Sequence, residues 1–139
     1  MISFNFENDF SLHNQELLIK WVTLAIKAEG FKLGEINYIF CNDDYLHRIN
    51  VEFLDHDTLT DIISFDYTVG KILQGDIYIS TERVADNAND FNVTFDNELH
   101  RVMIHGVLHY CGYKDKTENQ ASLMRSKENH YLGLLSEIQ

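Results

Sequence analysis

The segment HGVLHYCGYKD, residues 105–115, limits the folds open to this chain more than any other stretch. His105 and His109 are four residues apart, so on a helix their side chains lie on one face, one turn apart. Gly112 follows, and glycine tolerates the left-handed conformation that ends many helices. Asp115 comes three residues later, where a returning chain can reach both imidazoles. We therefore expect a long helix that ends beside a tight return of the chain.

The same four positions predict a metal site. Two histidines and one carboxylate, with a fourth position left for water, form a known type of catalytic zinc centre. We predict that His105, His109 and Asp115 hold one divalent metal ion, with zinc as the expected metal. The alternative is a pair of surface histidines on an amphipathic helix. Gly112 and Asp115 favour the metal, since the pair alone is a weak signal.

Hydrophobic periodicity along the rest of the chain predicts an α+β fold with a small, mostly four-stranded mixed sheet and about five helices. The expected strands span residues 2–6, 33–41, 61–67 and 76–80, and the expected helices 14–29, 43–53, 81–90, 94–111 and 117–135. Gly70 and Gly75 are expected to bracket a turn-rich connection, and Phe53 to face inward. No repeat or linker-like stretch interrupts the sequence, so we expect one domain over residues 1–139.

The charge balance restricts the partners of the chain. Eleven Lys and Arg residues stand against 22 Asp and Glu residues, a net charge of −11. Such a protein repels a polyanion at long range, so it lacks the broad basic face of many nucleic-acid-binding proteins. Any role on RNA must use a local positive feature, such as a bound metal, or delivery by a partner.

Other general features point to a soluble protein of the cytoplasm. No apolar run approaches the roughly 18–20 residues that span a bilayer, and the first ten residues do not resemble a secretion signal. Cys41 and Cys111 are too few for a disulfide framework, which favours a reducing compartment. We expect no membrane contact and no nucleotide cofactor.

Three stretches of the chain resemble the YbeY family, the bacterial metal-dependent endoribonucleases of ribosomal RNA maturation. Residues 105–115 match the family pattern H-G-x-L-H-x-x-G-Y-D-H at most positions. Residues 60–65, TDIISF, are similar to the family stretch T-D/N-V-L-S-F, and residues 74–80, QGDIYIS, to the stretch L-G-D-I-x-I. The resemblance covers almost the whole chain. It implies three metal ligands at His105, His109 and Asp115, and ribosomal RNA and ribosomal proteins as partners.

The chain departs from the family pattern in two places. The third ligand is usually histidine, and Asp115 lowers the net charge of the metal centre, so a bound water should be less acidic. The family also carries an arginine implicated in activity, within the stretch Y-R-G-K-D. The matching residues here, 53–57, read FLDHD, so Leu54 stands at the position of the arginine. Leu54 cannot replace a guanidinium. Arg48, one or two helical turns earlier, is a candidate substitute, although a solvated helix arginine is the simpler interpretation.

The resemblance implies a single-strand-specific, metal-dependent endoribonuclease that acts in 3′-end maturation of small-subunit ribosomal RNA and in ribosome quality control. No residue identifies itself as the general base, and Thr60, Asp61 and Ser64 are candidate cleft neighbours by resemblance. Leu54 and the acidic charge favour an alternative, a non-catalytic metal-containing ribosome-biogenesis factor. A metal peptidase is a weaker alternative. The motif is similar to that of metzincins, but Gly106 stands where those enzymes carry the glutamate base.

Overall fold

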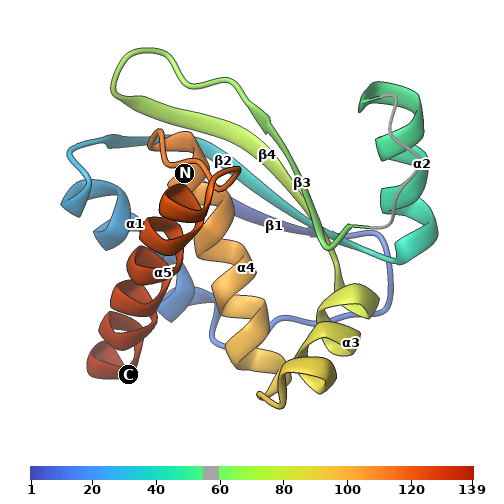
Figure 1. The fold of residues 1–139 in the computed structure, drawn as a ribbon. Coiled ribbons are helices and arrows are strands. Elements are labelled where there is room, and N and C mark those ends of the chain that lie inside the picture. Colours follow the sequence, from blue (N-terminus) through green and yellow to red (C-terminus); the bar gives the residue numbers. More distant parts are fainter. Residues whose placement is uncertain (55–59) are drawn as a thin grey trace.

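The computed structural model describes residues 1–54 and 60–139, and in these residues it shows one four-stranded sheet and five helices (Figure 1). The strands are β1 (Ile2–Phe6), β2 (Lys32–Cys41), β3 (Ile62–Asp66) and β4 (Ile72–Ser80). The helices are α1 (Gln15–Ala28), α2 (Asp43–Leu54), α3 (Thr81–Phe91), α4 (Phe95–Tyr110) and α5 (Glu118–Ile138). The predicted α+β class is confirmed.

The sheet is mixed, with strand order β1-β2-β4-β3. β2 pairs in parallel with both β1 and β4, while β3 pairs with β4 in antiparallel fashion. β3 and β4 therefore form an antiparallel hairpin. β3 lies at the edge of the sheet, so one side of this strand has no neighbouring strand.

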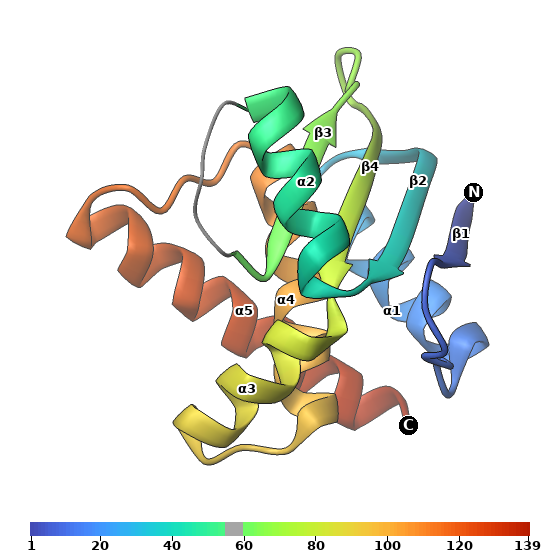
Figure 2. The same cartoon turned by 90° about the vertical axis from the view of Figure 1, so that its right-hand side faces the viewer.

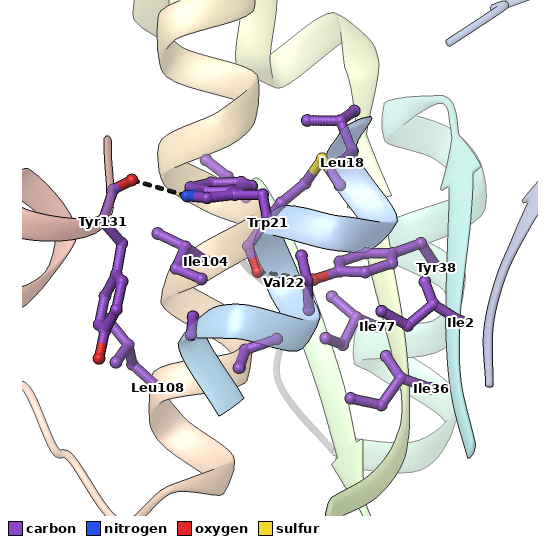
Figure 3. Close-up of a cluster of buried hydrophobic side chains, with 14 of the residues drawn as sticks. Ile2, Leu18, Trp21, Val22, Ile36, Tyr38, Ile77, Ile104, Leu108 and Tyr131 are labelled. Carbon is purple, nitrogen blue, oxygen red and sulfur yellow. Dashed lines mark hydrogen bonds between the residues drawn. The ribbon is translucent and has the colours of Figure 1, made fainter. Parts of the chain in front are cut away.

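Helices cover the two faces of the sheet unequally. Figure 2 shows α2 in front of the sheet and α4 behind it, and Figure 1 places α1 and α5 on the same side as α4. The larger core lies on the α4 side, where Trp21 and Tyr38 are fully buried. Trp21 donates a hydrogen bond to the Tyr131 carbonyl at 2.6 Å, and Tyr38 donates one to the Met103 carbonyl at 3.0 Å (Figure 3). These bonds tie α1, α4, α5 and the sheet together.

Local signals set the ends of α4 and α5. The Thr94 hydroxyl accepts from the Asn97 amide at 3.1 Å and caps α4 at its start. Gly112 has φ +103°, a conformation that glycine adopts without strain, and it ends α4 as expected. Thr117 and Gln120 form a capping box at the start of α5. A short return segment, residues 111–117, therefore lies between two well-defined helix ends.

Two boundary predictions and one burial prediction were wrong. Gly75 lies inside β4, which begins at Ile72, and a glycine is needed there because the phenol of Tyr110 and the Phe65 carbonyl approach too closely for a side chain. Phe53 is 68% exposed, since the smaller core beneath α2 is filled by Cys41, Leu46 and Ile63. α5 continues to Ile138, three residues beyond the expected end.

No helix in residues 1–54 and 60–139 combines the length and the apolarity that crossing a membrane requires.

We expect Gly75→Ala to destabilise the fold. An added Cβ would lie 2.5 Å from both the Phe65 carbonyl oxygen and the Tyr110 hydroxyl. Overpacking of this kind lowers the free energy of unfolding by about 1–3 kcal/mol. The control is Gly133→Ala on α5, where a Cβ meets open space and should stabilise the helix by about 0.5–1 kcal/mol. Urea unfolding of both variants measures the two effects, and equal stabilities would contradict the close packing at Gly75.

Candidate metal centre

The end of α4 and the return segment bring three candidate ligands together. The Nε2 atoms of His105 and His109 are 2.9 Å apart. Oδ2 of Asp115 lies 3.2 Å from the His105 Nε2 and 3.4 Å from the His109 Nε2. In a tetrahedral zinc site with bonds of 2.0–2.1 Å, neighbouring ligand atoms are roughly 3.3 Å apart. The three predicted ligands are therefore placed as three corners of such a site.

Proton positions on the two imidazoles strengthen this interpretation. The His105 Nδ1 faces Glu128 Oε2 at 2.7 Å, and the His109 Nδ1 faces the Tyr113 carbonyl oxygen at 2.9 Å. Carboxylate and carbonyl oxygens only accept, so each Nδ1 carries the proton and each neutral ring has a bare lone pair at Nε2. Two such lone pairs and the Asp115 carboxylate then face one point. A cation at that point satisfies all three, so the donor set fits a divalent metal.

Glu128 orients His105 from the neighbouring helix α5. Its carboxylate is buried and accepts from His105 through one oxygen and from Arg101 through the other, the latter at 2.9 Å. Arg101 also donates to the Asn129 side chain at 2.9 Å. The guanidinium neutralises the buried carboxylate, which would otherwise be costly to remove from water.

The return segment is fixed to α1 and orients His109. The Tyr113 hydroxyl donates to the Glu29 carboxylate at 2.6 Å, while the Tyr113 carbonyl accepts from the His109 ring. Tyr131 and Lys127 of α5 also donate to Glu29. Each imidazole therefore has its own acceptor, as metal-ligating histidines usually do.

The pKa values follow from these contacts. Burial of His105 acts to lower its pKa, but the Glu128 hydrogen bond and the charges of Glu128, Asp115 and Asp61 outweigh it and raise the pKa. Burial of Glu128 acts to raise its pKa, but His105 and Arg101 outweigh it and lower the pKa. Since a metal binds the deprotonated imidazole, proton competition at His105 should weaken metal binding as the pH falls.

A cavity of about 290 Å³ opens directly on the metal cluster. His105 and Asp115 form part of its wall, so a molecule in the cavity would touch the metal ligands. Asp61, at the start of β3, lines the same cavity, and burial raises the pKa of its carboxyl. The Asn87 amide donates to that carboxyl at 3.4 Å.

The structure separates the candidate cleft residues. Asp61 lies at the cavity, whereas Ser64 lies farther along β3 opposite Ile77 and does not line it. The Thr60 hydroxyl is turned to the backbone of its own segment. The Arg48 guanidinium lies over the Tyr45 ring, at 5.6 Å from its centroid, on α2 and therefore on the opposite face of the sheet from α4.

Leu54, at the position of the family arginine, is the last described residue of its run. Asp55, His56 and Asp57 lie outside the described residues. Whether the lack of an arginine here reduces activity stays a prediction.

Gly106 packs against the sheet. A Cβ at this position would lie 3.1 Å from the side chains of both Ile62 and Ile77. Ile62 belongs to β3 and Ile77 to β4, so a side chain at position 106 would point toward these two strands. A glutamate here would require Ile62 and Ile77 to shift, and in this chain the position holds a glycine, so the metzincin-type base is missing.

Four groups at the site were missed by the sequence analysis: Glu128, Arg101, Glu98 and the Tyr113 carbonyl. Glu98 had a detectable signal, since it precedes His105 by seven residues and so shares its helix face. Glu128 had none, because it reaches His105 only through the packing of α5 on α4.

Comparison with known proteins identifies relatives over nearly the whole chain. A family model described as Endoribonuclease YbeY matches residues 3–136. An endoribonuclease YbeY of Flavobacterium johnsoniae is 60% identical over 134 residues, covering 96% of both chains. One of Christiangramia forsetii is 58% identical, covering 96% of this chain and 93% of the relative. The solution structure of a Thermotoga maritima protein is similar with a TM-score of 0.70 and 28% identity, covering 97% of this chain and 89% of that one.

We expect Glu128→Gln to weaken metal binding by about 10- to 100-fold, the usual effect of losing a partner of a metal-bound histidine. A glutamine must present its NH₂ group either to His105 or to Arg101, both of which are donors in the native contact. Facing His105, it favours the tautomer with the proton on Nε2, which blocks the metal. Zinc affinity measured against a competing chelator tests this.

The matched control for this prediction is Glu137→Gln, which removes the same charge from an exposed position on α5. Its zinc affinity should equal that of the unchanged protein. Equal affinity of the Glu128→Gln variant would show that His105 does not depend on Glu128 for its orientation.

Proposed function

Since this chain belongs to the YbeY endoribonuclease family, we propose that it is a metal-dependent endoribonuclease that cuts single-stranded RNA. We propose that its substrate is ribosomal RNA, in 3′-end maturation of the small subunit and in ribosome quality control, and that it works in the cytoplasm with ribosomal proteins as partners. The observation that carries the catalytic proposal is the convergence of His105, His109 and Asp115 on one point beside an open cavity.

A divalent metal bound there, with zinc as the proposed ion, would polarise a phosphoryl oxygen and make a bound water more acidic. His105 and His109 supply neutral nitrogen ligands, because Glu128 and the Tyr113 carbonyl hold the protons on the opposite ring nitrogens. Asp61 shares the cavity wall with His105 and is the candidate acceptor for a proton released there.

The local charge assigns the attraction for RNA to the metal. The cavity is lined by two basic and four acidic side chains, so a bound divalent ion would bring its formal charge to about zero. The whole chain has a net charge of −11. A phosphodiester would therefore be attracted to the metal and repelled by most of the remaining surface.

We expect the double change His105→Ala and His109→Ala to remove about one metal ion per chain and to lower cleavage of single-stranded RNA at least about 100-fold, because the metal's charge stabilisation is lost. A chelator should abolish cleavage by the unchanged protein. The control is His13→Ala, an exposed histidine outside the cluster. Elemental analysis and gel assays on a labelled oligonucleotide measure both effects.

One result of this assay would favour the non-catalytic alternative. If the unchanged protein holds its metal but does not cut RNA, free or on a small ribosomal subunit, it is a metal-containing biogenesis factor rather than a nuclease.

We expect Asp115→His to keep the metal and to shift the pH–rate profile of RNA cleavage to lower pH. Replacing a carboxylate by a neutral imidazole raises the net charge of the centre by one, so a bound water becomes more acidic. Asp115 is 40% exposed, which leaves room for the larger ring. Rates measured between pH 5 and 9 test this, and a profile that stays in place or moves to higher pH would count against water activation by the metal.

A further inference from the structure

The cavity at the metal cluster has apolar residues in its wall beside the charged ones. Ile62 and Val102 line it from β3 and α4. Phe91, the last residue of α3, also lines it and has 60% of its surface exposed. An aromatic ring left this exposed beside a cavity offers a face for another ring to stack on.

Glu98 is the unusual group in this cavity. It is only 5% exposed and lines the cavity from α4, yet in residues 1–54 and 60–139 it has no hydrogen-bond or ion-pair partner. Glu128, equally buried, is satisfied by both His105 and Arg101. The oxygens of this carboxyl are not sealed from solvent, so a hydrogen-bond donor that enters the cavity can reach them. Burial raises the pKa of Glu98, and a donor bonded to it would stabilise its charged form.

The charges around Glu98 narrow the choice of ligand. Arg101 and Arg125 also line the cavity and would repel a second metal ion. Glu98 and Asp61 would repel a phosphate group placed deep inside. A neutral group is repelled neither by the arginines nor by the carboxylates, and its hydrogen-bond donors can bind Glu98. A nucleobase with an amino group is a neutral group of this kind.

We propose that this cavity binds the base of the nucleotide next to the phosphate held at the metal, an inference that rests on the proposed RNA substrate. In this proposal the base stacks against the Phe91 ring and contacts the apolar side chains of Ile62 and Val102. Glu98 accepts from its Watson–Crick edge, where guanine offers two adjacent donors and cytosine and adenine offer an amino group. Uracil presents two carbonyl oxygens beside its single N–H and is disfavoured. Arg125, 59% exposed at the rim, is placed to contact the backbone outside.

The test is a titration of the zinc-loaded protein with 5′-GMP, 5′-CMP, 5′-UMP and ribose 5-phosphate, followed by NMR shifts of backbone amides. All four probes share the phosphate, so the metal contributes equally and differences report the base. We expect GMP to shift the amides of Phe91, Glu98 and Val102 and to bind about tenfold more tightly than UMP, as a bidentate contact discriminates. Ribose 5-phosphate should leave those three amides unchanged.

Two variants locate the effect. Glu98→Gln should lower the preference for GMP over UMP to about twofold or less, because an amide can serve either base. Phe91→Ala, an exposed position that the fold does not need, should weaken GMP and UMP alike by roughly fivefold or more. The matched controls are Glu137→Gln and Phe53→Ala, an exposed phenylalanine on α2, and neither should change nucleotide binding.

The outcomes separate this inference from the proposed function. If GMP and UMP bind equally, or if ribose 5-phosphate gives the same shifts, the nucleobase pocket is wrong, even when the protein cleaves RNA. Shifts from ribose 5-phosphate at Glu98 would instead indicate that the carboxyl binds a sugar hydroxyl. If GMP binds in the cavity but no RNA is cut, the pocket stands and the nuclease proposal falls.

Discussion

The Glu128 carboxylate joins α5 to α4, where it contacts both Arg101 and the candidate metal ligand His105. The geometry of the site depends on these two contacts. Through one oxygen it fixes the proton of His105, and through the other it meets Arg101. Without the arginine, the carboxylate would be a buried unpaired charge, and without the carboxylate the imidazole would be free to protonate at the metal-binding nitrogen. The partner ligand is fixed separately, because Tyr113 holds the His109 ring through its carbonyl and binds Glu29 through its hydroxyl. Packing of α5 against α4 and α1 is therefore a condition for a preorganised metal centre.

Charge is distributed so that a strongly acidic chain can still act on RNA. Most of its surface repels a polyanion, which suppresses nonspecific binding. The metal centre at the end of α4 is the proposed exception, since a divalent ion there would offset the acidic side chains that line the cavity. Asp115 would lower the net charge of the metal centre by one, because a carboxylate is negatively charged and an imidazole in its place would be neutral.

The cluster of three candidate metal ligands could be predicted from the sequence because local geometry sets the positions of its residues. The spacing of His105 and His109 follows from one helical turn, and Gly112 ends the helix where a left-handed residue is needed. The positions of the candidate cleft residues could not be predicted in the same way. Asp61 lies at the cavity, but Arg48 is on α2, across the sheet, because residues close in the sequence to a motif need not lie on its side of the molecule.

Patterns within about a dozen residues were enough to predict most of the helices and strands and the three candidate ligands. Only the tertiary structure decided what surrounds the ligands. Glu128 lies 23 residues from His105, and nothing in an exposed-looking amphipathic helix marks it as buried. Glu98 likewise looks like an ordinary helix glutamate until the neighbouring segments reduce its exposure to 5% and leave it in the wall of the cavity. Burial and pairing of charged groups arise from contacts between distant segments, and a periodicity along the chain contains no information about which segments will meet.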